Sequence, residues 1–221
     1  MGLQVSDEIL DTTVAPELSK LKVCGARIIR RGPNQFARYQ ILTMFGQKKY
    51  KKHVHALLVV YFRRVDFARE EYNLGCKRLR TYISKLPHNN SQTRFYRLAL
   101  CHFETCLLHL HAANTSSKAI AKSLTQPVSE DADEKSLRQL ANRVRHFDED
   151  IYDPKKGKLT GNNGIAPVWI TNTSLKSEKT ELSFVKLREI LVTVESECKE
   201  MCEILLEKQQ LCVHNIRTNS R

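Results

Sequence analysis

The spacing of apolar residues in the middle of the chain is the feature that most constrains its fold. Apolar side chains recur every three or four residues over 48–83, and again over 92–124. At about 100° per residue, this spacing places them on one face of an α-helix. The tetrapeptide Pro87-His88-Asn89-Asn90 separates the two runs and is typical of a turn. The sequence therefore predicts two long helices that pack side by side in a bundle.

Two further regions complete the predicted fold. Residues 166–173 and 180–185 are rich in β-prone side chains, and the polar residues 174–179 between them would form the turn of a small hairpin. Helical spacing resumes from about Phe184 and continues to the polar end of the chain. We therefore expect a mainly α protein, an antiparallel bundle of four to five helices with a small β-hairpin at about 166–185 before the last helix.

The domain organisation follows from where the periodic segments lie. The 221 residues are enough for one domain with an appendage. Residues 1–47 carry mixed signals and are expected to be an N-terminal appendage that is partly ordered. The helical bundle is predicted to span 48–207, and 208–221 to be a polar C-terminal tail.

The charge of the chain indicates a polyanionic partner. Lys and Arg number 36 against 24 Asp and Glu, for a formal net charge of +12. An excess of this size raises the likelihood of nucleic-acid binding. The first long helix interleaves basic and aromatic residues, an arrangement that suits a phosphate backbone. The predicted nucleic-acid contacts are Lys51, Lys52, Arg63 and Arg64, with Arg145 further along. The alternative is that these basic residues form an ordinary solvent-exposed face of the helix, opposite its packed apolar face, because this would give the same sequence pattern.

Several classes of function are not indicated. The chain has no phosphate-binding glycine loop, nucleophile elbow or zinc-protease motif. Its seven cysteines include no pair spaced for a zinc ribbon, so reduced thiols and a cytoplasmic location are expected. The longest apolar run, 56–62, is too short to span a bilayer, and no membrane association is predicted. His102, Cys106 and His109 have metal-ligand spacing without an evident fourth ligand, so neither a metal nor a cofactor is predicted.

The most informative stretch for function is the predicted helix 137–151. Its apolar residues form one stripe, and the opposite face carries four polar side chains of different chemistry. These are Arg138, Asn142, His146 and Glu149. A guanidinium, an amide, an imidazole and a carboxylate on one face suggest a site, although a solvated helix face would look the same.

The segment 142–149, Asn-Arg-Val-Arg-His-Phe-Asp-Glu, resembles the signature of the HEPN family of helical proteins, the higher eukaryotes and prokaryotes nucleotide-binding proteins. In that family an Arg, usually followed by a polar residue such as Asn, precedes a His by four to six residues. Many members continue with an aromatic and acidic run similar to 147–149. The order of helices is also similar, over roughly residues 48–207.

The resemblance implies metal-independent RNA cleavage, or RNA or nucleotide binding, in a toxin–antitoxin or phage-defence setting. Two motif helices, here 137–151, would meet in a homodimer and form a composite site. A cognate partner or antitoxin protein is also implied. His146 would act as general acid or base on the ribose 2′-hydroxyl, and an Arg would stabilise the phosphorane charge. The implied catalytic residues are His146, Arg138, Arg143, Asn142 and Glu149.

The sequence departs from the family pattern at Ala141, where the family has its Arg. Arg138 shares the face of His146 and would have to replace it, so nuclease activity is expected to be weakened or lost. Three hypotheses follow: an RNA-cleaving HEPN-like protein, a non-cleaving relative that binds RNA, or an unrelated helical scaffold that acts as a protein–protein interaction module with no nucleic-acid ligand.

Overall fold

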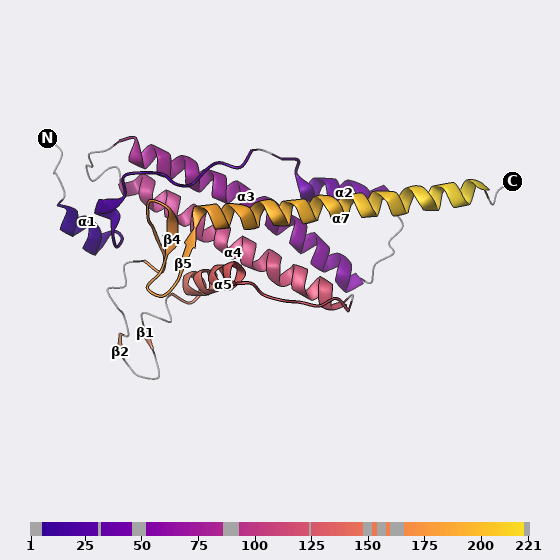
Figure 1. Cartoon of the computed structure of the whole chain (residues 1–221). Coiled ribbons are helices and arrows are strands. Elements are labelled where there is room, and N and C mark those ends of the chain that lie inside the picture. The colour runs from indigo at the N-terminus through magenta and orange to yellow at the C-terminus, as the bar shows by residue number, and fades with distance from the viewer. Residues whose placement is uncertain are drawn as a thin grey trace.

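The computed structural model is mainly helical, which confirms the predicted fold class (Figure 1). It describes residues 6–30, 32–45, 52–85, 93–123, 125–147, 152–153, 158–159 and 166–218. The helices are α1 (Asp7–Thr13), the 3-10 turn η1 (Leu18–Lys20), α2 (Gln35–Phe45), α3 (Lys52–Ile83), α4 (Thr93–Ser123), α5 (Ala132–Arg145) and α7 (Phe184–Thr218). The strands are β1 (Tyr152–Asp153), β2 (Lys158–Leu159), β3 (Trp169–Ile170), β4 (Ser174–Lys176) and β5 (Glu181–Ser183).

Helices α3 and α4 form the long hairpin at the centre of the molecule and pack most extensively of all element pairs. Their facing apolar stripes include the fully buried rings of Tyr72 and Phe103, which meet edge to face. Gly75 lies in the middle of α3, where a glycine costs about 1 kcal/mol relative to alanine. A Cβ at this position would approach the Phe103 ring to 3.0 Å. The glycine therefore allows α4 to come close to α3.

Helices α5 and α7 pack against this hairpin (Figure 1). The apolar stripe predicted for the motif helix is buried, with Leu137, Leu140 and Ala141 inaccessible. The helix begins at Ala132, earlier than predicted, because the Asp131 side chain caps it by accepting a hydrogen bond from the Glu134 backbone N–H at 2.7 Å. It ends at Arg145, and residues 148–151 of the predicted helix lie outside the described residues.

A three-stranded antiparallel sheet, β3-β4-β5, precedes α7 where a hairpin was predicted. The difference is β4, which occupies the segment expected to be the turn. One turn is formed by residues 171–174, where the Thr171 N–H donates to the Ser174 carbonyl at 2.9 Å. A second turn, 177–180, overlaps the end of the predicted one, and there the Ser177 N–H donates to the Thr180 carbonyl at 2.8 Å. Residues 174–176 are thereby free to pair with both neighbouring strands, and Leu175 is buried in the core.

Side-chain amides hold the N-terminal segment against the bundle. Asn73 of α3 accepts from the Ile29 N–H at 2.8 Å and donates to the Ile29 carbonyl at 3.1 Å. Asn172, next to the sheet, accepts from the N–H groups of Lys22 and Val23, both at 2.9 Å. The segment thus makes hydrogen bonds that a neighbouring strand would otherwise supply. The predicted domain boundary at residue 47 lies outside the described residues.

A buried polar network joins α2, α3 and α7. Asp66 of α3 accepts from the backbone N–H groups of Gln35 and Phe36 and so caps the start of α2. Arg69, one turn later, is paired with Asp66 at 3.3 Å and with Glu195 of α7 at 2.9 Å. Among the helices that the structure describes, none is both long and apolar enough to cross a membrane.

Candidate functional site

The predicted site residues on α5 are engaged with carboxylates of neighbouring segments. Arg138 makes a two-pronged hydrogen bond to Glu130, with N–O distances of 3.0 and 3.1 Å. This contact lowers the pKa of Glu130 and raises that of Arg138. Arg143 lies 3.7 Å from Glu178, which precedes β5. Both guanidinium groups therefore have a nearby counter-charge.

The remaining predicted residues lie at the end of α5. Asn142 is half-buried, and Arg145 and His146 are exposed. His146 is the C-cap residue, and its backbone N–H donates to the Asn142 carbonyl at 3.0 Å, one turn earlier. The backbone of His146 thus stays next to the last turn of the helix even though the helix has ended. Glu149 lies outside the described residues.

His111 of α4 is a site residue that the sequence alone did not single out. It is half-buried on the side of α4 that faces α5. Its pKa is lowered first by burial and then by the positive charges of Arg145 and Arg138. The fold therefore brings one imidazole into the electrostatic field of two of the predicted arginines, which lie seven residues apart on α5.

Glu104 lies two turns before His111, on the same side of α4. Burial raises the pKa of its carboxyl to about 7. A carboxyl with this pKa exchanges protons near neutrality, which is the property required of a general acid or base. We name the group formed by His111, Arg138, Arg145 and His146 the α4–α5 flank.

Ala141, at the position where the HEPN pattern has its arginine, is fully buried at 0% exposure. It packs with Leu137 and Leu140 in the core. An arginine side chain at this position would point into the bundle. Arg138 and Arg143 are instead half-buried on α5, and Arg145 is exposed.

The nucleic-acid contacts predicted on α3 lie on the other side of α4. Arg64 donates to Nδ1 of His109 at 2.7 Å, and the Arg63 guanidinium carbon lies 5.3 Å from the centre of the Phe67 ring. Lys52 is exposed at the first residue of α3, and Lys51 lies outside the described residues. The structure therefore separates Arg63 and Arg64 from the α4–α5 flank.

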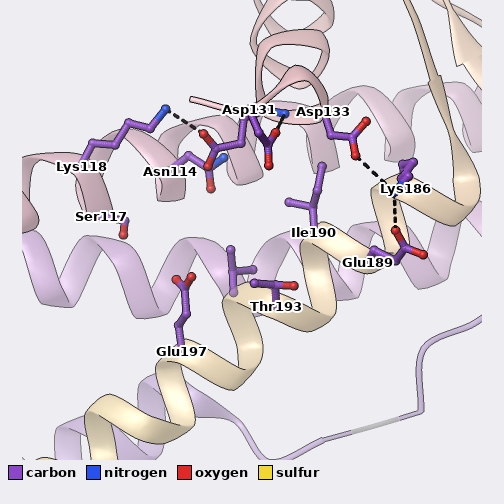
Figure 2. Close-up of a pocket in the computed structure, with 12 residues that line it drawn as sticks. Asn114, Ser117, Lys118, Asp131, Asp133, Lys186, Glu189, Ile190, Thr193 and Glu197 are labelled. Carbon is purple, nitrogen blue, oxygen red and sulfur yellow. Dashed lines mark hydrogen bonds and ion pairs between the residues drawn. The ribbon is translucent and has the colours of Figure 1, made fainter. Parts of the chain in front are cut away.

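A cleft of about 250 Å³ opens between α4, the start of α5 and α7 (Figure 2). Its two lysines are paired with carboxylates, Lys118 with Glu134 at 3.0 Å and Lys186 with Asp133 at 3.5 Å. The lining carboxylates outnumber these lysines; they are Asp131, Asp133, Glu134, Glu189 and Glu197. Such a lining repels phosphate, so the cleft does not suit an RNA backbone.

No family model matches the chain, and no curated protein or solved structure is significantly similar to it. Within the described residues, no group of three His, Cys, Asp or Glu side chains is arranged to hold a metal ion. His102, which the sequence placed with Cys106 and His109, is instead paired with Glu71 through Nδ1 at 2.7 Å.

Proposed function

We propose that this chain is a HEPN-like protein that binds RNA on the α4–α5 flank and has lost most of the nuclease activity of that family. The observation that carries the proposal is that His111 lies in the electrostatic field of both Arg145 and Arg138, and that His146 is exposed directly after the end of α5. Guanidinium and imidazole groups at one surface suit phosphate oxygens. The net charge of +12 adds long-range attraction for a polyanion.

The loss of cleavage is proposed because of Ala141 and Glu130. The motif position contributes a buried methyl group in place of a guanidinium, and Arg138 is held by Glu130. Stabilising the phosphorane requires a cation that is already aimed at the developing charge. Arg138 would have to leave Glu130 before it could take this role. We therefore expect RNA binding to be retained and RNA cleavage to be lost.

The proposal includes the assembly implied by the same resemblance. Two copies would pair through the exposed end of α5, which places two His146 side chains near one RNA strand. A cognate antitoxin protein would act by covering this surface, in a toxin–antitoxin or phage-defence setting. Analytical ultracentrifugation tests the pairing, and a strictly monomeric protein at micromolar concentration would contradict it.

RNA binding is tested by fluorescence anisotropy with a labelled single-stranded RNA over a series of salt concentrations. Arg138→Gln/Arg145→Gln should weaken binding about tenfold and lower the salt slope by about 1.4, since each single-strand phosphate contact contributes about 0.7. The control Arg27→Gln/Arg30→Gln removes two exposed guanidinium groups from the N-terminal segment. Equal losses in the two double variants would contradict a specific role for the flank.

Cleavage is tested with mixed RNA in EDTA, followed by analysis of the fragment ends. Metal-independent attack by the 2′-hydroxyl leaves a cyclic phosphate, and deoxyribose at the cut position would prevent it. We expect little or no cleavage by the natural chain. Fragments with cyclic phosphate ends that disappear in His146→Ala would show that the nuclease has been retained.

A second function is favoured by exposed apolar side chains on α2. Ile41 is 56% exposed and Met44 is 79% exposed on this helix, which packs on α3 and α7. Large exposed apolar residues are frequent at protein–protein contacts. If the natural chain retains no RNA at low salt, a protein–protein interaction module becomes the better reading.

A further inference from the structure

The side of α4 that faces away from α5 carries a compact cluster of cations and rings. The Arg63 guanidinium lies over the Phe67 ring, and the Phe67 ring centre is 5.3 Å from that of His109. Arg64 completes the group through its 2.7 Å hydrogen bond to His109 Nδ1. We name these four residues the α3–α4 seam cluster. They are held together by aromatic and imidazole contacts between the two helices.

The charge of this cluster is not compensated by acidic side chains. In the described part of the chain, neither Arg63 nor Arg64 has a carboxylate within ion-pair distance, whereas Arg69 and Arg138 both do. The acidic group that acts on the pKa of His109 is Glu71, and it is hydrogen-bonded to His102. Two guanidinium groups with open donors therefore remain at the surface.

The neutral form of His109 supplies one further hydrogen-bond donor to the cluster. A guanidinium can only donate hydrogen bonds, so Nδ1 of His109 must accept from Arg64. The ring hydrogen of the neutral imidazole is then on Nε2. The Arg64 and Arg63 charges act together with burial to lower the pKa of His109, which keeps this neutral form dominant at neutral pH. Phe67 is 38% exposed, so part of its ring is accessible.

We propose that the α3–α4 seam cluster is a second RNA contact surface, which binds a single-stranded segment through its phosphates and one base. Arg63 and Arg64 would contact phosphate oxygens, and the accessible part of Phe67 would stack against a base. The proposal rests on RNA binding as the function of the chain. An acidic peptide would satisfy the two charges, but an exposed ring fixed beside two uncompensated guanidinium groups is better matched by a base next to a phosphate.

The test is anisotropy with a labelled oligouridylate, which has little structure of its own. Arg63→Gln/Arg64→Gln should weaken binding about tenfold and lower the salt slope by about 1.4. Phe67→Leu keeps an apolar side chain of similar size and should weaken binding at least about fivefold, because stacking on one base contributes on this scale. The control is again Arg27→Gln/Arg30→Gln, with circular dichroism and thermal unfolding to show that each variant is folded.

The outcomes separate this inference from the proposed function. Binding that is lost in the α4–α5 flank variant and unchanged in the seam variants would overturn the inference and leave the proposed function in place. Binding lost only in the seam variants would support the inference and move the RNA site away from α5. No binding by the natural chain would overturn both.

Competition with polyglutamate distinguishes the other partner class. Unlabelled RNA should displace the labelled oligouridylate at a far lower concentration than polyglutamate of equal charge. In Phe67→Leu, the concentrations of the two competitors needed for displacement should be closer to each other. Equal competition by the two polymers, with no effect of Phe67→Leu, would identify the cluster as a general anion surface suited to acidic proteins and would overturn the RNA assignment.

Discussion

The two flanks of α4 use arginine in opposite ways. On the flank facing α5, Arg138 is bound by both oxygens of Glu130. On the other flank, Arg63 and Arg64 contact the rings of Phe67 and His109. Each flank also holds a half-buried histidine whose pKa is lowered by burial and by neighbouring arginines. The flanks therefore resemble each other in composition and differ in how their charge is compensated.

This difference shows that a basic side chain in a sequence is not yet an available cation. A guanidinium held by a carboxylate must give up that partner before it can bind a phosphate, whereas one held by an aromatic ring keeps its charge and most of its donors. The family resemblance drew attention to α5. Among the described residues, the packing leaves Arg63 and Arg64 of α3 without a carboxylate at ion-pair distance, whereas Arg138 of α5 has one.

The strongest way to break the comparison is to introduce the arginine of the HEPN pattern with Ala141→Arg. We expect the free energy of unfolding to fall by at least about 3 kcal/mol, because the side chain would be forced into a filled core or would bury an unpaired charge. Urea denaturation measures the change, and Gln139→Arg on the exposed side of α5 is the control. A stable Ala141→Arg protein with new ribonuclease activity would show that this face of α5 is assigned wrongly.

The second prediction concerns Glu104 of α4. Its folded-state pKa of about 7 lies above the ordinary value of 4.5. Between these two values the folded state holds a proton that the unfolded state has lost, so stability falls as pH rises from about 4.5 to 7. Glu104→Gln should remove this dependence and raise the free energy of unfolding at pH 8 by about 2 kcal/mol. Urea denaturation at pH 4 and pH 8 tests this, and an equal effect at both would contradict the raised pKa.

The smallest expected effect comes from Glu130→Gln, which removes the carboxylate partner of Arg138 and leaves it, like Arg63 and Arg64, without that counter-charge. Removing this carboxylate frees Arg138 and takes a negative charge from beside the proposed RNA site. We expect RNA affinity to rise about threefold to fivefold at low salt, and the gain to shrink as salt is added. The control Glu178→Gln removes one carboxylate from beside Arg143. An affinity that is unchanged would indicate that Arg138 does not contact RNA.

Much of the candidate site on α5 was predictable because it follows from local periodicity. The three-and-four spacing of apolar residues correctly assigned Leu137, Leu140 and Ala141 to the core and left Arg138 and His146 outside it. The helix boundaries were less predictable. The helix was predicted to begin at Leu137, but capping by Asp131 places its first residue at Ala132.

The partners of those residues could not be predicted, because they come from distant parts of the chain. Glu178 reaches Arg143 from the segment before β5, and His111 reaches the field of Arg138 and Arg145 from α4. Periodicity places Glu104 and His111 on one side of α4, but it does not say which helix covers that side. The sequence contains the side chains, and the packing of α5 on α4 decides which of them meet.

The sequence by itself determined the helical bundle, because apolar periodicity and turn residues act over short distances. Gly75 shows the limit of such local information. In the sequence it is an unfavourable residue inside a helix, and the structure shows that its missing side chain leaves room for the ring of Phe103. The same limit applies to charge. The number of arginines is fixed by the sequence, but the carboxylate partner of Arg138 and the ring partners of Arg63 and Arg64 depend on tertiary packing, because a charge is compensated through space.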